Sequence, residues 1–273
     1  MKIKISLLLL SICFSLNISA KTEYYELVDS AEVNIKEKRW DRAESFLKEL
    51  LRSYPDDNNN SLIISNLATV QRYQGKVSEA IRNYSFAINM TPNAVTLLKN
   101  RASLYLEVDS VARALSDYDR ILSLDEKDEE SRYYHGILSL RVGNLDEAKL
   151  NFDYILYYNP ASGLGREGLA HYNKIKKDYT QAIKYFTEII EQFPSAILYS
   201  NRAECYLAKK RLNEAEKDID KALGITPEDG YLYVLRAKLR KLRFDRGAME
   251  ADLMLAEKYG FSRELAEEIL RVK

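Results

Sequence analysis

The prolines of this 273-residue chain recur with one period. Pro55, Pro92, Pro160, Pro194 and Pro227 are the only five, and their successive positions differ by 37, 68, 34 and 33, where 68 is twice 34. A fixed period in this range is typical of proteins built from stacked repeats, in which each unit buries its apolar face against the next unit. The sequence therefore predicts a row of similar units of about 34 residues.

Small side chains recur with the same period. Two helices can cross closely only where the side chain at the contact is small, so alanine or glycine is expected at each crossing. The first series is Ala43, Ala80, Ala114, Ala148, Ala182 and Ala215; the second is Ala31, Ala68, Ala102, Gly136, Ala170, Ala203 and Ala237. The two series predict two close helix crossings in each unit.

The apolar spacing inside a unit is helical. Leu98, Ala102 and Tyr105 fall on one helical face, and a similar face recurs in the second half of the unit at Ala114, Tyr118 and Ile121. Gly75 and Gly143 stand in short polar stretches where the first helix of a unit should end. Proline cannot continue a helix, so it marks the connection to the next unit. Each unit is therefore predicted to be a helix–turn–helix hairpin.

Composition agrees with an all-helical chain. Only 10 glycines and 5 prolines are present, which disfavours a fold of many strands and tight turns. Charged residues make up 30% of the chain, with 41 basic and 41 acidic side chains, which argues against a membrane-embedded protein and a basic nucleic-acid surface. Aromatic residues make up 11%, too many for a disordered chain. We expect a soluble domain with no nucleic-acid partner.

The chain resembles the tetratricopeptide repeat (TPR) family. That family has a large residue at position four, a small one at eight, an aromatic at eleven, alanine at twenty, an aromatic at twenty-four, a small or apolar residue at twenty-seven and proline at thirty-two. The best match is Tyr199, Ala203, Tyr206, Ala215, Ile219, Ala222 and Pro227. The resemblance implies an all-α, right-handed α-solenoid of stacked hairpins over residues 21–261. The expected repeats are 24–57, 61–94, 95–128, 129–162, 163–196, 196–229 and 230–263.

Some positions depart from the family pattern. Residues 56–60 lengthen the connection after the first repeat, and this polar loop is expected to loosen that junction. Glu126 stands where proline is expected. In the last repeat Met249 replaces the alanine and Phe244 comes two residues earlier than the usual aromatic of the turn, so an irregular turn register is expected there.

A terminal helix is expected over residues 262–273. Ser262 can cap it, and Leu265, Ile269 and Leu270 share one helical face. The last repeat of a solenoid needs a cover for its open apolar side. We expect this helix to bury those three side chains and act as the cap.

Residues 1–20 have the order of a secretory signal peptide. Lys2 and Lys4 precede an apolar run, and small residues end the segment at Ala20. We expect cleavage after Ala20 and export to the periplasm or the exterior. The alternative is lipidation of Cys13, which would anchor the chain to a membrane, although the bulky Ile12 departs from a lipobox. Membrane association is expected only in that case.

No catalytic, metal or cofactor site is expected. His135 and His171 lie in different repeats, and neither has a second histidine or cysteine at ligand spacing. Cys205 has no apparent histidine partner and is expected to be a buried, inert thiol. The segment 163–168 matches GxGxxG, but no strand precedes it, so a weakened helix start is the better interpretation than a dinucleotide site. The chain is predicted not to be an enzyme.

The resemblance places a binding surface on the first helices of the repeats. In the family these helices line the concave face through positions two, five, six, nine, twelve and thirteen. Tyrosine combines a large apolar face with a hydroxyl and loses little rotamer entropy, which suits recognition of another chain. The candidate partner-binding residues are Asn66, Tyr73, Lys99, Asn100, Tyr133, Tyr134, His171, Asn201, Glu204 and Tyr231.

The expected function is a non-catalytic protein–protein interaction scaffold that binds a peptide segment or a protein partner in its groove. The alternative is an accessory or regulatory subunit of an envelope-associated enzyme or assembly complex. Some TPR proteins clamp a C-terminal carboxylate with lysines, an arginine and asparagines at set positions. Here Lys99 is followed by Ser103, and Tyr134, Glu167 and Gly168 replace the rest, so no such clamp is expected.

Overall fold

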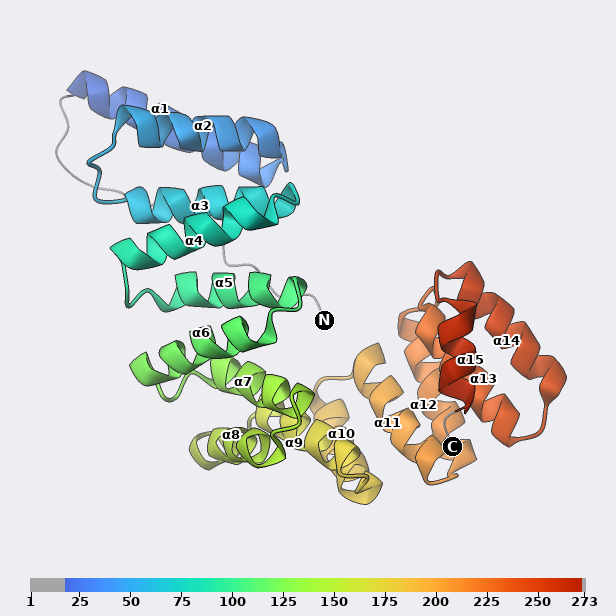
Figure 1. Ribbon diagram of the computed structural model, residues 1–273. Helices are drawn as coiled ribbons and strands as arrows, with labels where there is room; N and C mark the ends of the chain where they lie inside the picture. Colours follow the sequence, from blue (N-terminus) through green and yellow to red (C-terminus); the bar gives the residue numbers. More distant parts are fainter. Residues whose placement is uncertain (1–17, 272–273) are drawn as a thin grey trace. The chain divides into compact units, whose positions relative to one another are not determined.

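The computed structural model describes residues 18–271, and all regular secondary structure in that range is α-helical (Figure 1). The helices follow one another as hairpins, so the predicted fold class is confirmed. Within the described range they are α1 Ile18–Lys36, α2 Trp40–Ser53, α3 Asn60–Tyr73, α4 Val77–Met90, α5 Val95–Glu107, α6 Val111–Leu124, α7 Glu129–Arg141, α8 Leu145–Tyr158, α9 Gly163–Ile175, α10 Tyr179–Gln192, α11 Ala196–Ala208, α12 Leu212–Ile225, α13 Gly230–Leu242, α14 Arg246–Lys258 and α15 Arg263–Arg271.

The turn inside each hairpin uses one left-handed residue. Only two of these residues are glycines, Gly75 and Gly143, which stand two residues beyond the ends of α3 and α7 as predicted. The left-handed region carries no steric penalty for glycine but a small one for other residues. The full series in the described hairpins is Lys38, Gly75, Asp109, Gly143, Lys177, Lys210 and Phe244.

The last hairpin has a regular register, so the prediction of an irregular turn was wrong. Phe244 occupies the left-handed position, with φ of 61°, and it follows Lys210, the left-handed residue of the previous hairpin, by one full period. Met249 follows Phe244 at the same spacing as Ala215 follows Lys210. Phe244 is therefore the turn residue itself rather than a displaced core aromatic, and its side chain is 95% exposed. Met249 packs at the edge of the local core.

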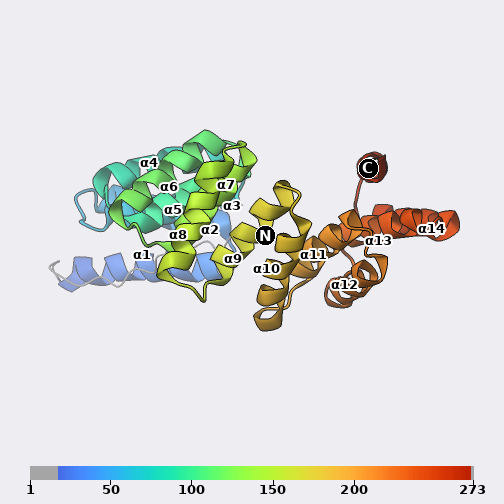
Figure 2. The same ribbon diagram turned by 90° about the horizontal axis from the view of Figure 1, so that it is seen from below.

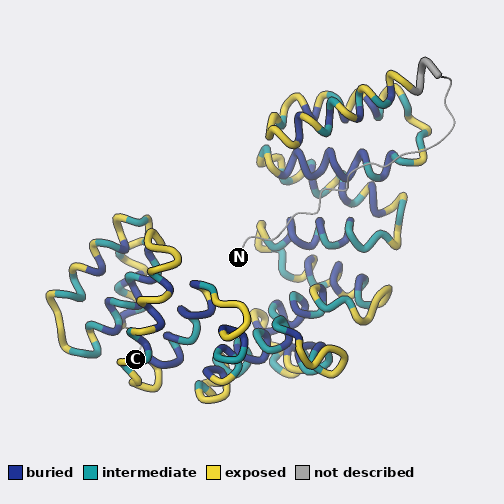
Figure 3. The backbone as a smooth tube through the Cα atoms, turned by 180° about the vertical axis from the view of Figure 1, so that it is seen from behind, coloured by how far each residue is buried: buried dark blue, intermediate teal, exposed yellow. Residues whose placement is uncertain are grey.

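The helices form two compact units, residues 1–135 and 136–273, with the division inside α7. Neighbouring hairpin helices lie side by side in both views (Figures 1 and 2), and buried positions follow the faces that meet other helices (Figure 3). In the first unit one core cluster joins α1, α2 and α3 through Leu47, Leu50 and Ile63. In the second unit a larger cluster continues from α9 to α13 and includes Phe186 and Ile219. Each core is built between successive hairpins, as stacked repeats require.

Two of the three glycines of the GxGxxG segment, Gly165 and Gly168, are required by packing. The ring of Phe152 on α8 lies between Gly136 on α7 and Gly168 on α9. A Cβ at Gly168 would lie 2.0 Å from Phe152 Cδ1, and a Cβ at Gly165 would lie 2.8 Å from Leu156 Cδ2. The segment is the regular start of α9, capped by the Ser162 hydroxyl, which accepts from the Gly165 backbone N–H. The missing side chains at Gly165 and Gly168 make room for α8, while the weakening that glycine is expected to cause in this helix start stays a prediction.

The loop after the first hairpin is closed by its own polar groups. The Asn60 amide donates to the carbonyl oxygens of Tyr54 and Pro55, at 3.0 and 2.7 Å. The Asp57 carboxylate accepts from the backbone and side chain of Asn59. Ile63, just beyond the loop, is fully buried in the core shared with α1 and α2. The expectation of a loosened junction was therefore wrong, since the extra residues form a hydrogen-bonded turn.

An arginine holds the connection after the third hairpin, where Glu126 stands in place of the expected proline. The Arg132 guanidinium donates to the carbonyl oxygen of Glu126 at 2.6 and 3.0 Å, and it lies six residues further along the chain. Arg166 donates in the same way to the carbonyl oxygen of Pro160, again six residues earlier. Both contacts hold the connecting turn against the next helix, so Glu126 fits the same loop.

The terminal helix covers the last hairpin with two of the three predicted residues, Ile269 and Leu270. Ala266 and Leu270 of α15 are buried against α13 and α14, with Ile269 partly buried. Leu265 remains 47% exposed, so its predicted burial was wrong. The buried face of α15 runs through Ala266 and Leu270, which are four residues apart, and Leu265 lies beside that face. Polar contacts also hold α15, including one from Lys241 Nζ to the carbonyl oxygen of Leu270.

The expected signal peptide falls mainly on residues 1–17, and these residues, including Cys13, lie outside the described range. Residues 18–20 form the beginning of α1. Among the described helices, none combines the length and the apolar character needed to cross a membrane.

Candidate functional site

All ten candidate residues lie on the first helices of their hairpins. This placement follows from the repeat period, which returns equivalent positions to equivalent helices. Six belong to the first unit and four to the second, and each unit is considered separately. In order, α3 carries Asn66 and Tyr73, α5 carries Lys99 and Asn100, α7 carries Tyr133 and Tyr134, α9 carries His171, α11 carries Asn201 and Glu204, and α13 carries Tyr231.

In the first unit an arginine that the sequence analysis did not single out joins two first helices. The side chain of Arg72 on α3 is 3% exposed. Its Nε donates to Glu107 on α5 at 2.8 Å, and its Nη2 donates to Ser103 at 2.8 Å. Arg72 occupies position twelve of its repeat, one of the positions that line the groove in the family. That position was the available signal, but it did not show which partner the arginine would take.

Lys99 is held by carboxylates of the next hairpin. Its Nζ donates to Asp128 at 2.8 Å and to Glu130 at 3.0 Å. Burial opposes the charged ammonium, yet these two hydrogen bonds raise the pKa of Lys99 above its usual value. Burial also opposes the charge of Asp128, yet hydrogen bonds from the same lysine and from the Ser131 backbone N–H lower the pKa of this carboxyl. Lys99 therefore carries a charge that is already neutralised within the chain.

The candidate tyrosines of the first unit differ in accessibility. Tyr73 is 45% exposed and stacks on Trp40, with ring centroids 4.5 Å apart. Tyr134 is half-buried and stacks on Tyr118 at 5.8 Å. Tyr133 is only 3% exposed, and Asn66 and Asn100 are buried as well. Of these residues, Tyr73 and Tyr134 present the larger ring surfaces to a partner.

In the second unit the structure brings three candidates together around one lysine. Lys174 Nζ on α9 lies 2.7 Å from Glu204 Oε2 and donates to Asn201 Oδ1 at 2.8 Å, both on α11. The Tyr231 hydroxyl on α13 donates to Glu204 Oε1 at 2.8 Å. We call Lys174, Asn201, Glu204 and Tyr231 the polar ladder. It crosses three successive first helices.

The polar ladder remains accessible. The side chains of Lys174 and Glu204 are 24% and 27% exposed. Burial and the neighbouring Glu204 carboxylate raise the pKa of the Tyr231 phenol, so it stays protonated and donates. His171 lies one turn before Lys174, half-buried, with its ring edge-on to Phe186. Charged and amide groups on one half-exposed face can bind the backbone or polar side chains of another chain.

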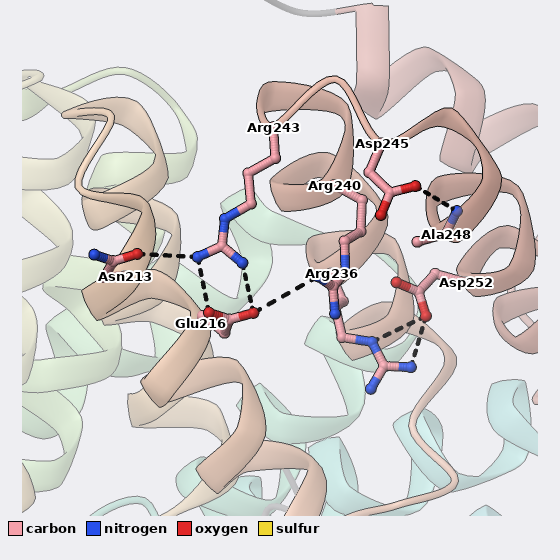
Figure 4. A network of polar contacts seen from close by, with 8 residues as sticks. All are labelled: Asn213, Glu216, Arg236, Arg240, Arg243, Asp245, Ala248 and Asp252. Atoms are coloured by element: carbon pink, nitrogen blue, oxygen red, sulfur yellow. Dashed lines mark hydrogen bonds and ion pairs between the residues drawn. The ribbon is translucent and has the colours of Figure 1, made fainter.

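The positions of the first helices are fixed by a repeated ion pair. Arg101, Arg202 and Arg236 each reach an aspartate 16 residues later on the second helix of the same hairpin, which places every pair at positions seven and twenty-three. Figure 4 shows the pair Arg236–Asp252. The aspartates are buried, and the contacts of 2.6–2.9 Å are charge-assisted. The threefold R-x15-D spacing was present in the sequence and could have predicted these pairs.

The other chemistry-bearing side chains serve packing in the described part of the chain. His135 is 8% exposed, and its Nε2 lies 3.0 Å from Asp119 Oδ1. Cys205 is fully buried, and burial raises the pKa of its thiol to about 12. A thiol of this kind is not a nucleophile at neutral pH. Among the described residues no group of three His, Cys, Asp or Glu side chains is placed to hold a metal ion.

Comparisons with known proteins identify the repeat type. Two family models, both described as tetratricopeptide repeat, match residues 65–129 and 176–230 and residues 27–57, together more than half of the chain. A tetratricopeptide repeat protein from Parabacteroides merdae has a similar solved structure, with a TM-score of 0.80 and 31% sequence identity, over 92% of this chain and 98% of that one.

Curated relatives are more distant and longer. The human DnaJ homolog subfamily C member 3 is 26% identical over 54% of this chain, and the Hsp70-Hsp90 organizing protein of Triticum aestivum is 26% identical over 54%. The chain spans about a third of the length of each, 32% in both cases. TPR proteins mediate protein–protein interactions, and TPR scaffolds are typically non-catalytic. The matched repeats and the similarity along nearly the whole chain place this protein in the tetratricopeptide repeat family.

Proposed function

We propose that this protein is a non-catalytic scaffold whose first-helix faces bind a peptide segment or a protein partner. The observation that carries the proposal is the polar ladder. It presents one ammonium, one carboxylate, one amide and one phenol along a face that crosses α9, α11 and α13. An extended chain laid across these helices would meet a donor or an acceptor at each one.

The internal pairing of the ladder favours a rigid site. Each of its groups already has a partner within the chain, so binding loses little side-chain entropy. The ladder also has spare hydrogen-bonding capacity, since an ammonium has three donors and a carboxylate has about four acceptor sites. A partner can therefore add contacts without displacing the internal ones. Exposed Ile197, at the N-terminal end of α11, supplies an apolar contact beside them.

A second function, as an accessory or regulatory subunit of an envelope-associated enzyme or assembly complex, is a form of the first. It is supported by the similarity to an organizing protein, whose name describes the organizing of Hsp70 and Hsp90. It requires that the bound partner be an enzyme or an assembly. Adding the purified chain to the captured partner and measuring the partner's rate separates this form from a passive scaffold.

We further propose that the protein is exported to the periplasm or the exterior after cleavage at Ala20, with lipid anchoring at Cys13 as the alternative. The support is the order of basic, apolar and small residues in segment 1–20. Mass spectrometry of the mature N-terminus tests both routes. A chain that starts at Lys21 supports cleavage, whereas a lipid-modified cysteine at the N-terminus supports anchoring. A chain that retains Met1 overturns both.

The binding face can be tested by site-specific photo-crosslinking in the native host. A photoreactive residue replaces Ile197, which is 53% exposed on the first helix α11. The matched control replaces Met254, which is 61% exposed on the second helix α14. We expect crosslinked partners at position 197 and few at position 254. Mass spectrometry of the crosslinked species then identifies the partner.

The ladder variants make the test specific. Glu204→Gln and Tyr231→Phe should reduce crosslinking at position 197 severalfold, because each removes a ladder contact and leaves the helices in place. Glu216→Gln is the control, since Glu216 also joins two hairpins through arginine but lies on the second helix α12. Equal crosslinking at both positions, or equal effects of the Glu204 and Glu216 variants, would rule out the first-helix face as the binding site.

A further inference from the structure

The turns of the last three hairpins in the second unit form a basic edge. The segment Lys174–Asp178 contains three lysines and one acid, Lys209–Glu214 contains three cations and one acid, and Arg240–Arg246 contains four cations and one acid. We define the basic edge by the exposed cations Lys176, Lys177, Lys209, Lys210, Arg211 and Arg246. Lys177 and Lys210 occupy the left-handed turn position of their hairpins, and the other four cations lie within two residues of that position, so the repeat period places the six at similar points of successive turns.

Contacts between neighbouring hairpins show that the three turns follow one another along the edge. Lys209 Nζ, in the α11–α12 turn, donates to Thr180 Oγ1 at the start of α10. Arg243, in the α13–α14 turn, donates to Asn213 and Glu216 at the start of α12 (Figure 4). Each turn therefore rests on the hairpin before it. The cations of the three turns lie on one continuous border of the unit.

Several of these charges have no partner within the described residues. Lys176, Lys177 and Lys210 are exposed and make no ion pair or hydrogen bond through their ammonium groups in that part of the chain. Arg211 is partly neutralised by Glu214, at 2.7 Å. A row of unpaired lysines on long, mobile side chains produces a positive field without a fixed binding geometry. This arrangement suits a diffuse anionic surface better than one bound ion.

Phe244 projects from the same edge. It occupies the left-handed turn position, where a bulky residue is unfavourable, and its ring is 95% exposed. The residues on either side are held down: Arg243 contacts Glu216, and the Asp245 carboxylate accepts from the Ala248 backbone N–H as the cap of α14 (Figure 4). With both neighbours fixed, the turn keeps the ring away from the protein. The exposed ring of Phe244 therefore contributes no buried apolar area to the stability of the fold.

We propose that the basic edge is a docking surface for an anionic lipid bilayer, with Phe244 as the apolar residue that enters the interface. Juxtaposed cations and an exposed aromatic ring are the two groups that bind a peripheral protein to such a bilayer, through anionic headgroups and through the boundary of the acyl chains. This contact does not depend on Cys13. It would place the second unit against a membrane and leave the polar ladder as a separate site.

A lipid surface fits these observations better than an acidic protein or a nucleic acid. A protein partner would need a pocket for Phe244 and fixed acceptors for the cations, whereas Lys176, Lys177 and Lys210 are unpaired among the described residues and the cations of the edge are spread over three turns. Single-stranded nucleic acid is bound by several aromatic rings that stack successive bases. On this edge the described turns provide one exposed ring, Phe244.

Vesicle co-sedimentation with the full chain tests the proposal. We expect binding to phosphatidylcholine vesicles that contain phosphatidylglycerol, weaker binding at higher salt, and none to phosphatidylcholine alone. Phe244→Gly should lower the affinity about tenfold, since the ring is lost. The exchange also removes an unfavourable turn conformation, so the variant should fold. Lys177→Gln together with Lys210→Gln should lower the affinity roughly thirtyfold at low salt, at about fivefold per charge.

Matched variants outside the basic edge test whether vesicle binding depends on the edge itself or only on the number of exposed lysines and aromatic rings. Lys184→Gln with Lys217→Gln removes two exposed lysines from the second helices α10 and α12, and Tyr157→Ser removes a ring that is 77% exposed on α8. Both should leave vesicle binding unchanged. The proposal is overturned if the wild-type protein does not bind anionic vesicles at low salt, or if the control variants lower vesicle binding as strongly as the edge variants do. It is also overturned if polyglutamate or single-stranded DNA is bound as well as the vesicles and without any contribution from Phe244.

Discussion

The Cα of Gly168 on α9 lies so close to the ring of Phe152 on α8 that an added Cβ would be 2.0 Å from Cδ1. Phe152 is fully buried, and its ring also meets Gly136 on α7, where an added Cβ would be 2.5 Å from Cε1. The ring cannot move without opening the contact between α8 and one of its neighbours. Phe152 therefore fits into the core only because glycine stands at the two helix positions that contact its ring.

Gly168→Ala is expected to destabilise the second unit. Alanine is the better helix former by about 0.5–1 kcal/mol, but overpacking a dense core costs about 1–3 kcal/mol. The net loss should be roughly 1–2 kcal/mol in urea unfolding. Gly224→Ala on α12 is the control, because a Cβ there meets nothing within 4 Å, and this variant should be neutral or slightly more stable. Similar effects of the two exchanges would contradict the packing explanation.

The repeated ion pair is expected to carry more stability than a surface pair. In Asp218→Ala the guanidinium of Arg202, 11% exposed, loses its bidentate partner, which should cost about 2–3 kcal/mol. Asp153→Ala breaks the pair with Lys149, in which both side chains are about half exposed, and should cost less than about 1 kcal/mol. Urea unfolding of both variants tests the difference. A double-mutant cycle with Arg202→Met should return a coupling energy well above that of the surface pair.

Acid should weaken the first hairpin through Glu44. Burial opposes its charge, but hydrogen bonds from Lys48, Lys76 and Gln71 lower the pKa of Glu44 from 4.5 to about 2. A lowered folded-state pKa gives stability that is present above the unfolded-state pKa and is lost as the pH falls through the folded-state value. The contribution, about 2 kcal/mol after allowance for the half-exposed lysines, should disappear between pH 4.5 and about 2.

The matched variants for this pH dependence are Glu44→Gln and Glu49→Gln. Glu44→Gln should be less stable at neutral pH and show a flatter dependence of stability on pH below pH 4.5. Glu49 is an exposed residue of the same helix, so Glu49→Gln should change neither the stability at neutral pH nor its pH dependence. Trp40, the single tryptophan of the chain, stacks on Tyr73 and reports unfolding of this region by fluorescence. A profile for Glu44→Gln that is parallel to wild type would show that the carboxylate is not the group responsible.

The repeat architecture could be predicted from the sequence because its determinants are local and periodic. Proline, alanine and tyrosine positions recur with one common period, and each specifies a turn or a helix crossing within one hairpin. Phe244 was misjudged because it was compared with the usual aromatic of the turn, two residues later, while its position was that of the left-handed residue. Counting from Lys177 and Lys210 would have given the correct register.

The candidate site was less predictable because its contacts join different hairpins. The first-helix positions followed from the family pattern, but the partner of each side chain depends on the distance and angle between neighbouring helices. Lys174 reaches Glu204 and Arg72 reaches Glu107, each on the first helix of the following hairpin, and the two pairs differ in their spacing along the chain. No periodic rule relates these pairs. The same reason explains why Leu265 was expected to be buried, since helical phase alone does not give the crossing angle of α15.

The terminal helix should protect the last hairpin through one leucine. Leu270→Ala should cost about 2–3 kcal/mol locally, because the side chain is buried beside Leu253 and Ala256. Leu265→Ala removes a side chain that is 47% exposed and should cost little. Deletion of residues 262–273 should act as Leu270→Ala does, but more strongly. Hydrogen exchange over residues 230–260 is the measurement, and unchanged protection in the truncated chain would show that α15 is not a cap.

The last prediction is that the chain does not act as a carboxylate clamp. Such a clamp needs unpaired cations on the first helices, but Lys99, at a clamp position, and Lys174, at another position of a first helix, are already neutralised. Lys99 is held by Asp128 and Glu130, and Lys174 is held by Glu204. An incoming carboxylate would meet an ammonium whose charge an internal carboxylate already balances, and that internal carboxylate would repel it, so little net attraction is left for the new contact. Fluorescence anisotropy with an acidic C-terminal tail peptide should therefore show no micromolar binding, and amidation of the peptide's carboxylate should change nothing. Glu204→Gln releases Lys174, so this variant should bind the free-acid peptide better than wild type does. Micromolar binding by wild type that amidation abolishes would contradict the prediction.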